Sequence, residues 1–268
     1  MNYKKHIIKY LPKKLLSIAF NLRYIIRYFR AYTNVKPSDV SGKSAMIVAP
    51  HPDDETFGCG GLIALKVAAG AAVRIVLLTD GEQVESASTE TKIEIIEARR
   101  KQFIDACEQL GLDAGSALKW LHLPDGNIPH PGQAGFQEAT IALCAEIDSF
   151  SPDEIYCPHF QDVNCDHVAS THLTFASRNL AKLKSSIFYY PIWMLYLNSK
   201  DLRMQLDLKN AFRLDISKVV SVKHRAIAAY LDAPSSANGS PYCGNLPWAL
   251  LWSFRRPSEI FFKTNEIC

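Results

Sequence analysis

The chain of 268 residues has no cysteine pattern that would build a disulfide framework or a zinc ribbon. No two of its seven cysteines have Cys-x-x-Cys spacing; they are residues 59, 107, 144, 157, 165, 243 and 268. An odd and scattered set of cysteines argues against paired disulfides and favours a reducing compartment. We therefore expect a cytoplasmic protein.

Acidic residues are absent from residues 1–38, which carry nine Lys or Arg. The other 21 basic and 27 acidic residues give the rest of the chain a formal charge of −6. An acidic body is a poor surface for nucleic acid, so we expect no nucleic-acid partner. The charge pattern divides the chain into a basic N-terminal arm, residues 1–36, and an acidic body, residues 44–268.

The arm also lacks an uncharged apolar run of the roughly 20 residues that a transmembrane helix needs. Its residues 3–32 instead predict an amphipathic helix, with Arg23, Arg27 and Arg30 on one line and an apolar stripe on another. The stripe consists of Leu15, Ile18, Leu22, Ile25, Ile26 and Phe29. Two interpretations remain open: an interfacial helix on the anionic cytoplasmic face of a membrane, or a helix that packs its stripe on the body or on a second subunit. Residues 33–43 are typical of a linker.

The body shows no internal repeat and no low-complexity tract. Apolar runs alternate with helical patterns, and this alternation predicts a single-domain, Rossmann-like α/β fold: a mostly parallel sheet with helices on both faces. We expect strands at 45–48, 73–78, 120–123, 154–157 and 187–190, and helices at 58–69, 91–110, 136–150 and 167–183. Beyond these, we expect a strand at 211–216, a helix at 219–231, a loop at 232–248 and an edge strand at 260–263.

The first predicted strand runs into the sequence APHPDDE, residues 49–55. An imidazole and two carboxylates within four residues suit a borderline divalent cation such as zinc. The loop after the fourth strand carries a second such pair, Asp166 and His167. Because the carboxyl ends of parallel strands share one rim of the sheet, we expect these two segments to meet.

With these two motifs, residues 44–230 resemble the PIG-L/LmbE-like deacetylase family. The resemblance implies that His51, Asp54 and His167 bind zinc and that Asp53 is the general base. Physical chemistry is consistent with this assignment of roles. Three protein ligands leave one coordination position for water, and a carboxylate that does not bind the metal can take the proton of that water. The implied reaction removes an N-acetyl group from an N-acetylglucosamine-like conjugate and releases acetate and a free amine.

The chain departs from the family pattern at one catalytic position. Many relatives have a second His three residues before the ligand His, where it helps to stabilise the oxyanion, and this chain has Asn164 there. Asn164 can still donate a hydrogen bond as a catalytic residue, but it brings no positive charge. His159, earlier in the same loop, is an alternative donor.

Two further matches concern the substrate, which the resemblance implies to be a small-molecule or lipid-linked amino sugar. Arg99 matches a family Arg that contacts substrate, and Asp125 matches an Asp that holds sugar hydroxyls. Each has a plainer alternative: Arg99 on a solvated helix face among neighbouring charges, and Asp125 in an Asp-Gly turn. Tyr242 and Trp248 are candidates for lining a sugar pocket.

Two other functions compete with the deacetylase. A pair of His and one carboxylate also form the facial triad of non-haem iron oxygenases. A non-catalytic, glycan-binding relative that keeps the fold is the other alternative, and Asn164 is the feature that favours it.

Overall fold

The structure, a computed structural model, describes residues 13–33, 36–37, 42–83, 91–197, 210–232 and 241–264. Eight strands form one sheet in the order β1-β7-β8-β6-β5-β2-β3-β4. Their bounds are β1 Lys36–Pro37, β2 Ala45–Ala49, β3 Val73–Thr79, β4 Leu118–Leu123, β5 Glu154–Pro158, β6 Ser186–Tyr190, β7 Ala211–Asp215 and β8 Ser258–Lys263. All pairings are parallel except those of β8, which runs antiparallel to β6 and β7.

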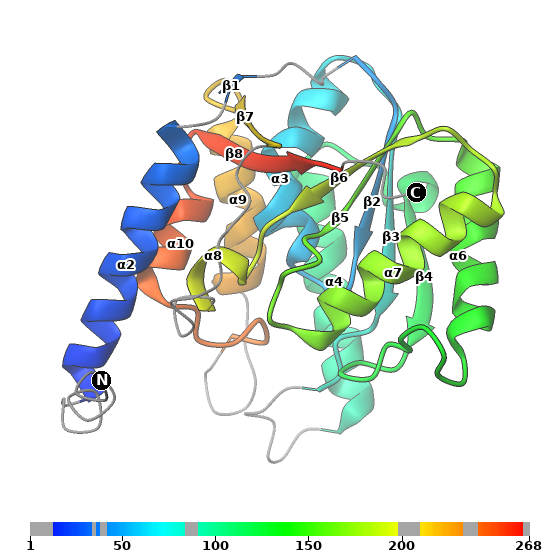
Figure 1. Cartoon of the computed structure of the whole chain (residues 1–268), viewed down its shortest axis with the longest axis horizontal. Helices are drawn as coiled ribbons and strands as arrows, with labels where there is room; N and C mark the ends of the chain where they lie inside the picture. The colour runs from blue at the N-terminus through cyan, green and yellow to red at the C-terminus, as the bar shows by residue number, and fades with distance from the viewer. Residues whose placement is uncertain are drawn as a thin grey trace, which may run out of the picture.

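Helices cover both faces of the sheet (Figure 1). On one face, α9 packs against both α3 and α4, and on the other α6 packs against α7. The helices are α2 Lys13–Thr33, α3 Asp54–Ala68, α4 Lys92–Gln109, α5 Ala114–Ala117, α6 Phe136–Phe150, α7 Cys165–Leu180, α8 Met194–Leu197, α9 Val220–Leu231 and α10 Trp248–Phe254. The predicted α/β fold with a mostly parallel sheet is confirmed.

The core is centred on β2, the continuous apolar run that precedes the acidic motif. All five residues of β2 are completely buried, which is typical of a strand covered by helices on both faces. On one face, helix α3 lies so close that a Cβ at Gly61 would come within 2.5 Å of Cδ1 of Ile216. Glycine therefore lets the helix that begins at the motif pack tightly on the core.

Three sequence predictions are wrong in detail. The strand expected at 260–263 is not at an edge, because β8 lies between β7 and β6. The linker expected at 33–43 includes strand β1, which pairs with β7 at the edge of the sheet. Helix α3 begins at Asp54 rather than at residue 58, so the motif carboxylates lie at its start, where the helix dipole favours them. The expected loop 232–248 falls partly outside the described residues.

The topology brings the two predicted metal segments together. From β2 the chain builds β3 and β4 on one side and then returns to place β5 on the other side of β2. Ligands of open α/β sheets bind at such a reversal, beyond the carboxyl ends of the strands. The turn after β2 and the loop after β5 meet at this point.

Helix α2 packs against α10 and α8 at the side of the body (Figure 1). Its buried residues are Asn21, Tyr24 and Tyr28, whereas Ile18, Leu22, Ile26 and Phe29 are exposed. Of the described part of the predicted stripe, Ile25 packs against the core, and Phe29 contacts the body with its ring centroid 5.9 Å from that of Trp252. The buried face of α2 is formed by aromatic and amide side chains instead. None of the helices in the described part of the chain is long and apolar enough to cross a membrane. Residues 1–12 of the predicted arm lie outside the described residues.

Candidate metal centre

Two imidazoles and a carboxylate gather where β2 and β5 end. His51 follows β2, Asp54 is the first residue of α3, and His167 lies in the first turn of α7. Oδ2 of Asp54 lies 3.1 Å from Nδ1 of His51 and 3.3 Å from Nε2 of His167. The potential ligand atoms of the three residues all lie within 4.8 Å of one another. This spacing would allow all three side chains to contact one cation.

A second group of possible ligands shares His51. Nε2 of His51 lies 3.2 Å from Oδ1 of Asp125 and 3.2 Å from Oδ2 of Asp166. The carboxylate of Asp166 also accepts hydrogen bonds from the backbone N–H groups of Gly126, at 2.7 Å, and Ile128, at 3.1 Å. An imidazole that donates from Nε2 to these carboxylates keeps the lone pair of Nδ1 for a metal, which is the usual outer-shell arrangement of a histidine ligand.

The charges at the site fit a cation. Burial favours the neutral form of His167, but Asp54 and Asp162 outweigh it and raise the pKa of His167 to about 10. Burial likewise opposes the charge on His51, yet its contacts with Asp125, Asp166 and Asp54 hold its pKa well above the usual value. The carboxylates thus create a negative potential between the two imidazoles. A divalent metal ion suits this donor set of nitrogen and oxygen.

Asp53 stands beside this group without joining it. Its backbone has φ 139°, a conformation that a non-glycine residue rarely adopts, and its N–H donates to Oε2 of Glu55 at 3.1 Å. Burial raises the pKa of Asp53 to about 8; the charge of Asp54 adds to this rise, and Arg99 opposes it. A carboxyl group with a raised pKa in a cleft is suited to exchange protons near neutral pH.

Arg99 is buried, so the alternative of a solvated helix face is wrong. Its guanidinium donates to the carbonyl oxygens of Gly81 and Tyr242, each at 3.2 Å, and of Pro52 at 2.8 Å. Nη2 also lies 3.3 Å from Oδ2 of Asp53. Arg99 therefore joins the loops after β2 and β3 to the segment around residue 242, and it lies beside the potential base.

The cavity over this group is open and lined on several sides. Asp125 contributes to its wall, while Oδ2 of Asp125 accepts the N–H of Gln83 at 2.7 Å. Tyr242 lines the cavity, as predicted from its loop, but Trp248 is exposed and does not. The other lining residues include Phe57, Val163, Ile192, Trp193, Leu246 and Phe254, which give the cavity an apolar side facing α8 and α10.

Comparison with known sequences identifies the domain that contains this site. Residues 46–177 match the PIG-L family, which is described as GlcNAc-PI de-N-acetylase. This segment of the chain is a PIG-L domain. The matched segment holds both parts of the metal centre and ends within α7.

Relatives of known activity fall into two classes. One is a 1D-myo-inositol 2-acetamido-2-deoxy-alpha-D-glucopyranoside deacetylase from a Mycobacterium species. It is 30% identical over an aligned length of 165 residues, and the match covers 55% of this chain and 54% of the relative. Another is a 4-oxalmesaconate hydratase from Pseudomonas putida, 30% identical over an aligned length of 146 residues, and this match covers 52% of this chain and 53% of the relative. This chain thus spans about half the length of the curated relatives it matches.

A solved structure supports the fold. A conserved protein from Thermus thermophilus, 24% identical, superposes with a TM-score of 0.59 over 84% of this chain and 96% of the other. At this identity the likeness extends to the α/β architecture alone. The α/β sheet is therefore the shared feature, and the chemistry has to be argued from the side chains.

The departure from the PIG-L pattern at Asn164 has a structural role. Asn164 is the N-cap of α7, and its Oδ1 accepts the N–H of Asp166 at 2.8 Å. Asn164 also lines the cavity. His159 does not line it: its ring stacks on Phe160, and burial lowers its pKa to about 4. Asn164 therefore remains the candidate donor of this loop, and His159 is a structural residue.

Two buried carboxylates of the site were not predicted from the sequence. Oδ1 of Asp162 faces Nδ1 of His167 at 3.5 Å, and its Oδ2 accepts the N–H groups of Trp193, at 2.9 Å, and Met194, at 3.1 Å. Glu55 is completely buried and accepts the hydroxyl of Tyr230 at 2.7 Å. The signal for Asp162 was its place five residues before the ligand His, since outer-shell carboxylates commonly accompany histidine ligands.

Proposed function

We propose that this PIG-L protein is a metal-dependent N-deacetylase that acts on an N-acetylglucosamine-like conjugate and releases acetate and a free amine. The observation that carries the proposal is the group of His51, Asp54 and His167 with Asp53 beside it. The arrangement supplies a cation site and, next to it, a carboxyl group that is not needed as a ligand. The names of the deacetylase relatives favour this reaction among those that such a site allows.

Zinc is the ion that the donor set favours, because two imidazoles and one carboxylate are typical of catalytic zinc sites. His51 through Nδ1, Asp54 through Oδ2 and His167 through Nε2 would hold it. When bound, such an ion lowers the pKa of a water molecule and polarises a carbonyl group. Asp162 and the pair Asp125 and Asp166 would hold the outer nitrogens of the two imidazoles.

The side chains around the ion would transfer the proton and stabilise the oxyanion of the substrate. Asp53 takes a proton from the attacking water, whose oxygen forms a bond to the acetyl carbonyl carbon. The amide C–N bond then breaks, and Asp53 returns the proton to the departing nitrogen. Arg99 keeps the carboxylate of Asp53 in place. Asn164 would donate from Nδ2 to the oxyanion, since its Oδ1 caps α7.

Substrate recognition is proposed for Arg99 and Asp125. Both line the cavity, yet both already have partners within the protein. Oδ1 of Asp125 faces His51, so a sugar hydroxyl at this carboxylate would lie beside the metal centre. We expect a small-molecule or lipid-linked amino sugar, bound by a catalytic domain that acts in the cytoplasm or at the cytoplasmic face of a membrane, to which residues 3–32 form the contact.

The experiment is an acetate-release screen of the zinc-loaded protein over N-acetylglucosaminides with varied aglycones, run with and without oxygen. Release of acetate in equal amount with free amine, independent of oxygen, is the expected result. Asp53→Asn should bind zinc as the parent does and lose nearly all turnover, and Asp105→Asn on the exposed face of α4 is the matched control. Oxygen-dependent turnover with Fe(II) would instead support an iron enzyme.

A second activity is tested in the same samples, because the hydratase relative is as similar to this chain as the deacetylase is. The same centre could add water to the double bond of an unsaturated carboxylic acid. Loss of the ultraviolet absorbance of such a substrate, with no acetate released from any glucosaminide, would support a hydratase. Binding of glucosaminides without any turnover would support a non-catalytic relative.

A further inference from the structure

Helix α2 presents two different faces to its surroundings. Toward the body, Asn21, Tyr24 and Tyr28 are at most 5% exposed. Away from it, Ile18, Leu22 and Ile26 are 58%, 57% and 49% exposed, and Phe29, which is 44% exposed, borders this side with its ring also against Trp252 of α10. The intervals of four, four and three residues align these four side chains along one side of the helix, and we call them the outer stripe. An aliphatic and aromatic line of this kind on an otherwise folded surface marks an interaction site.

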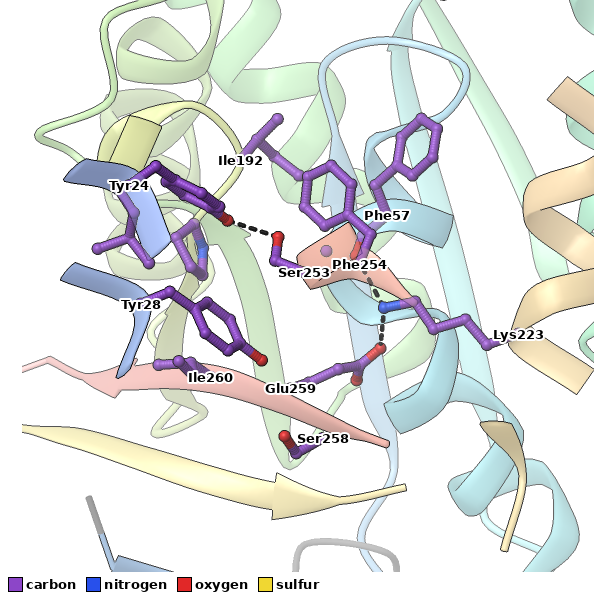
Figure 2. Close-up of a pocket in the computed structure, with 13 residues that line it drawn as sticks. Tyr24, Tyr28, Phe57, Ile192, Lys223, Ser253, Phe254, Ser258, Glu259 and Ile260 are labelled. Carbon is purple, nitrogen blue, oxygen red and sulfur yellow. Dashed lines mark hydrogen bonds and ion pairs between the residues drawn. The ribbon is translucent and has the colours of Figure 1, made fainter. Parts of the chain in front are cut away.

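The inner face fixes the orientation of α2. The hydroxyl of Tyr24 is hydrogen-bonded to that of Ser253 on α10, and the backbone N–H of Ala249 donates to Oδ1 of Asn21 at 3.3 Å. Figure 2 shows Tyr24 pointing toward Ser253, with Tyr28 lining the same pocket beside it. Turning the outer stripe inward would break these buried hydrogen bonds, so the stripe faces outward in the folded protein.

Charge identifies what the outer stripe fits. Residues 1–38 hold nine of the 30 basic residues and none of the 27 acidic ones. Arg23 and Arg27, which are half-buried on α2, make no ion pair with any described residue. A helix with an apolar line and with cations that form no ion pair with a described residue matches an anionic bilayer, in which apolar side chains enter the acyl boundary and cations meet the head groups.

We propose that α2 is a surface-docking helix that lies in the interface of an anionic membrane through the outer stripe and its basic residues. The proposal is independent of the reaction, because it uses no residue of the metal centre. The negative charge of the remaining chain repels the body from the same surface, so the protein would dock with α2 toward the lipid. A second copy fits less well, since two such helices would bring like charges together.

The test is sedimentation of the full chain with vesicles of phosphatidylcholine alone or mixed with phosphatidylglycerol. We expect binding to the mixed vesicles only, weakened by high salt. Leu22→Ser/Ile26→Ser and Arg23→Gln/Arg27→Gln should each bind at least about tenfold more weakly. The matched control is Ile93→Ser/Ile141→Ser, which removes two equally exposed apolar side chains from α4 and α6 and should bind as the parent does.

Three results would overturn the proposal. The first is equal binding to both kinds of vesicle, and the second is parental binding by the stripe variant. The third is self-association of the full chain, measured by sedimentation velocity without lipid, that the stripe variant abolishes while vesicles bind neither protein. Because Leu22 and Ile26 are exposed, the stripe variant should keep the parental thermal unfolding midpoint, which separates lost docking from lost folding.

Discussion

Arg99 places Nη2 3.3 Å from Oδ2 of Asp53, so a buried guanidinium lies beside the carboxyl group proposed as the base. The same guanidinium donates to the backbone of Pro52, the preceding residue. Arg99 is therefore a positioning residue for Asp53 as well as a candidate substrate contact. Its cation opposes the effect of burial on the pKa of Asp53.

Removing this cation should shift the pH dependence of catalysis. Arg99→Met raises the pKa of Asp53 further, and because a base must be deprotonated to act, the acidic limb of kcat/KM moves to higher pH. Arg99→Lys keeps a cation and should keep most of the parental profile. The pH profile of the purified variants checks this; a limb that stays in place in Arg99→Met would show that Arg99 does not act on Asp53.

Asp162 should strengthen metal binding through His167. Its carboxylate faces Nδ1 of His167, the nitrogen opposite the one directed at Asp54. We expect Asp162→Ala to weaken zinc affinity by about 10- to 100-fold, as loss of an outer-shell partner usually does. Competition with a chromophoric chelator measures the affinity, and Asp105→Ala is the exposed control. A zinc affinity within twofold of the parental value would show that Asp162 does not support metal binding by His167.

The buried ion pair of Lys223 and Glu259 should be needed for stability, because each buried charge neutralises the other. Nζ of Lys223 lies 2.6 Å from Oε1 of Glu259 (Figure 2). This carboxylate also accepts the N–H groups of Gly61 and Leu62 in α3. Lys223→Met leaves a buried charge without its partner and should cost about 3–5 kcal/mol of unfolding free energy. Urea unfolding measures this loss. The double variant Lys223→Met/Glu259→Gln should recover part of it; a single variant as stable as the parent would contradict the prediction.

His159 should make the protein less stable in acid. Burial lowers its pKa to about 4 in the folded state, from an ordinary value of 6.5. As the pH falls from 6.5 to 4, the unfolded chain takes up a proton that the folded chain excludes, so up to about 3 kcal/mol of stability is lost across that window. His159→Phe should flatten this part of the curve of unfolding free energy against pH. Parallel curves for parent and His159→Phe would refute the assignment.

The sequence was most informative where composition reflects burial directly. The apolar run of β2 and the motif that follows it indicated a buried strand and a polar rim, and the rule for parallel sheets brought His167 to the same rim. Strand order could not be predicted in this way. Strand β8 pairs with β6 and β7 through contacts that are remote in sequence and that no local pattern encodes. An edge strand and an interior one can share the same short apolar run.

Side-chain roles were harder to predict than elements. Arg99 lies among charged neighbours and looks like surface, yet the loops around it supply three carbonyl acceptors that let it be buried. On α2, the sequence left open whether the apolar stripe contacts a membrane, the body or a second subunit. The structure buries tyrosines against the body, because their hydroxyl and ring groups find partners on α10 and α8.

The central claim is that one cation binds between His51, Asp54 and His167. Anomalous diffraction at the zinc edge from crystals of the zinc-loaded protein tests it most directly. We predict a single strong peak within about 2.0–2.2 Å of one ligand atom from each of these three residues. A peak between His51, Asp125 and Asp166 instead, or no peak at either group, would contradict the account.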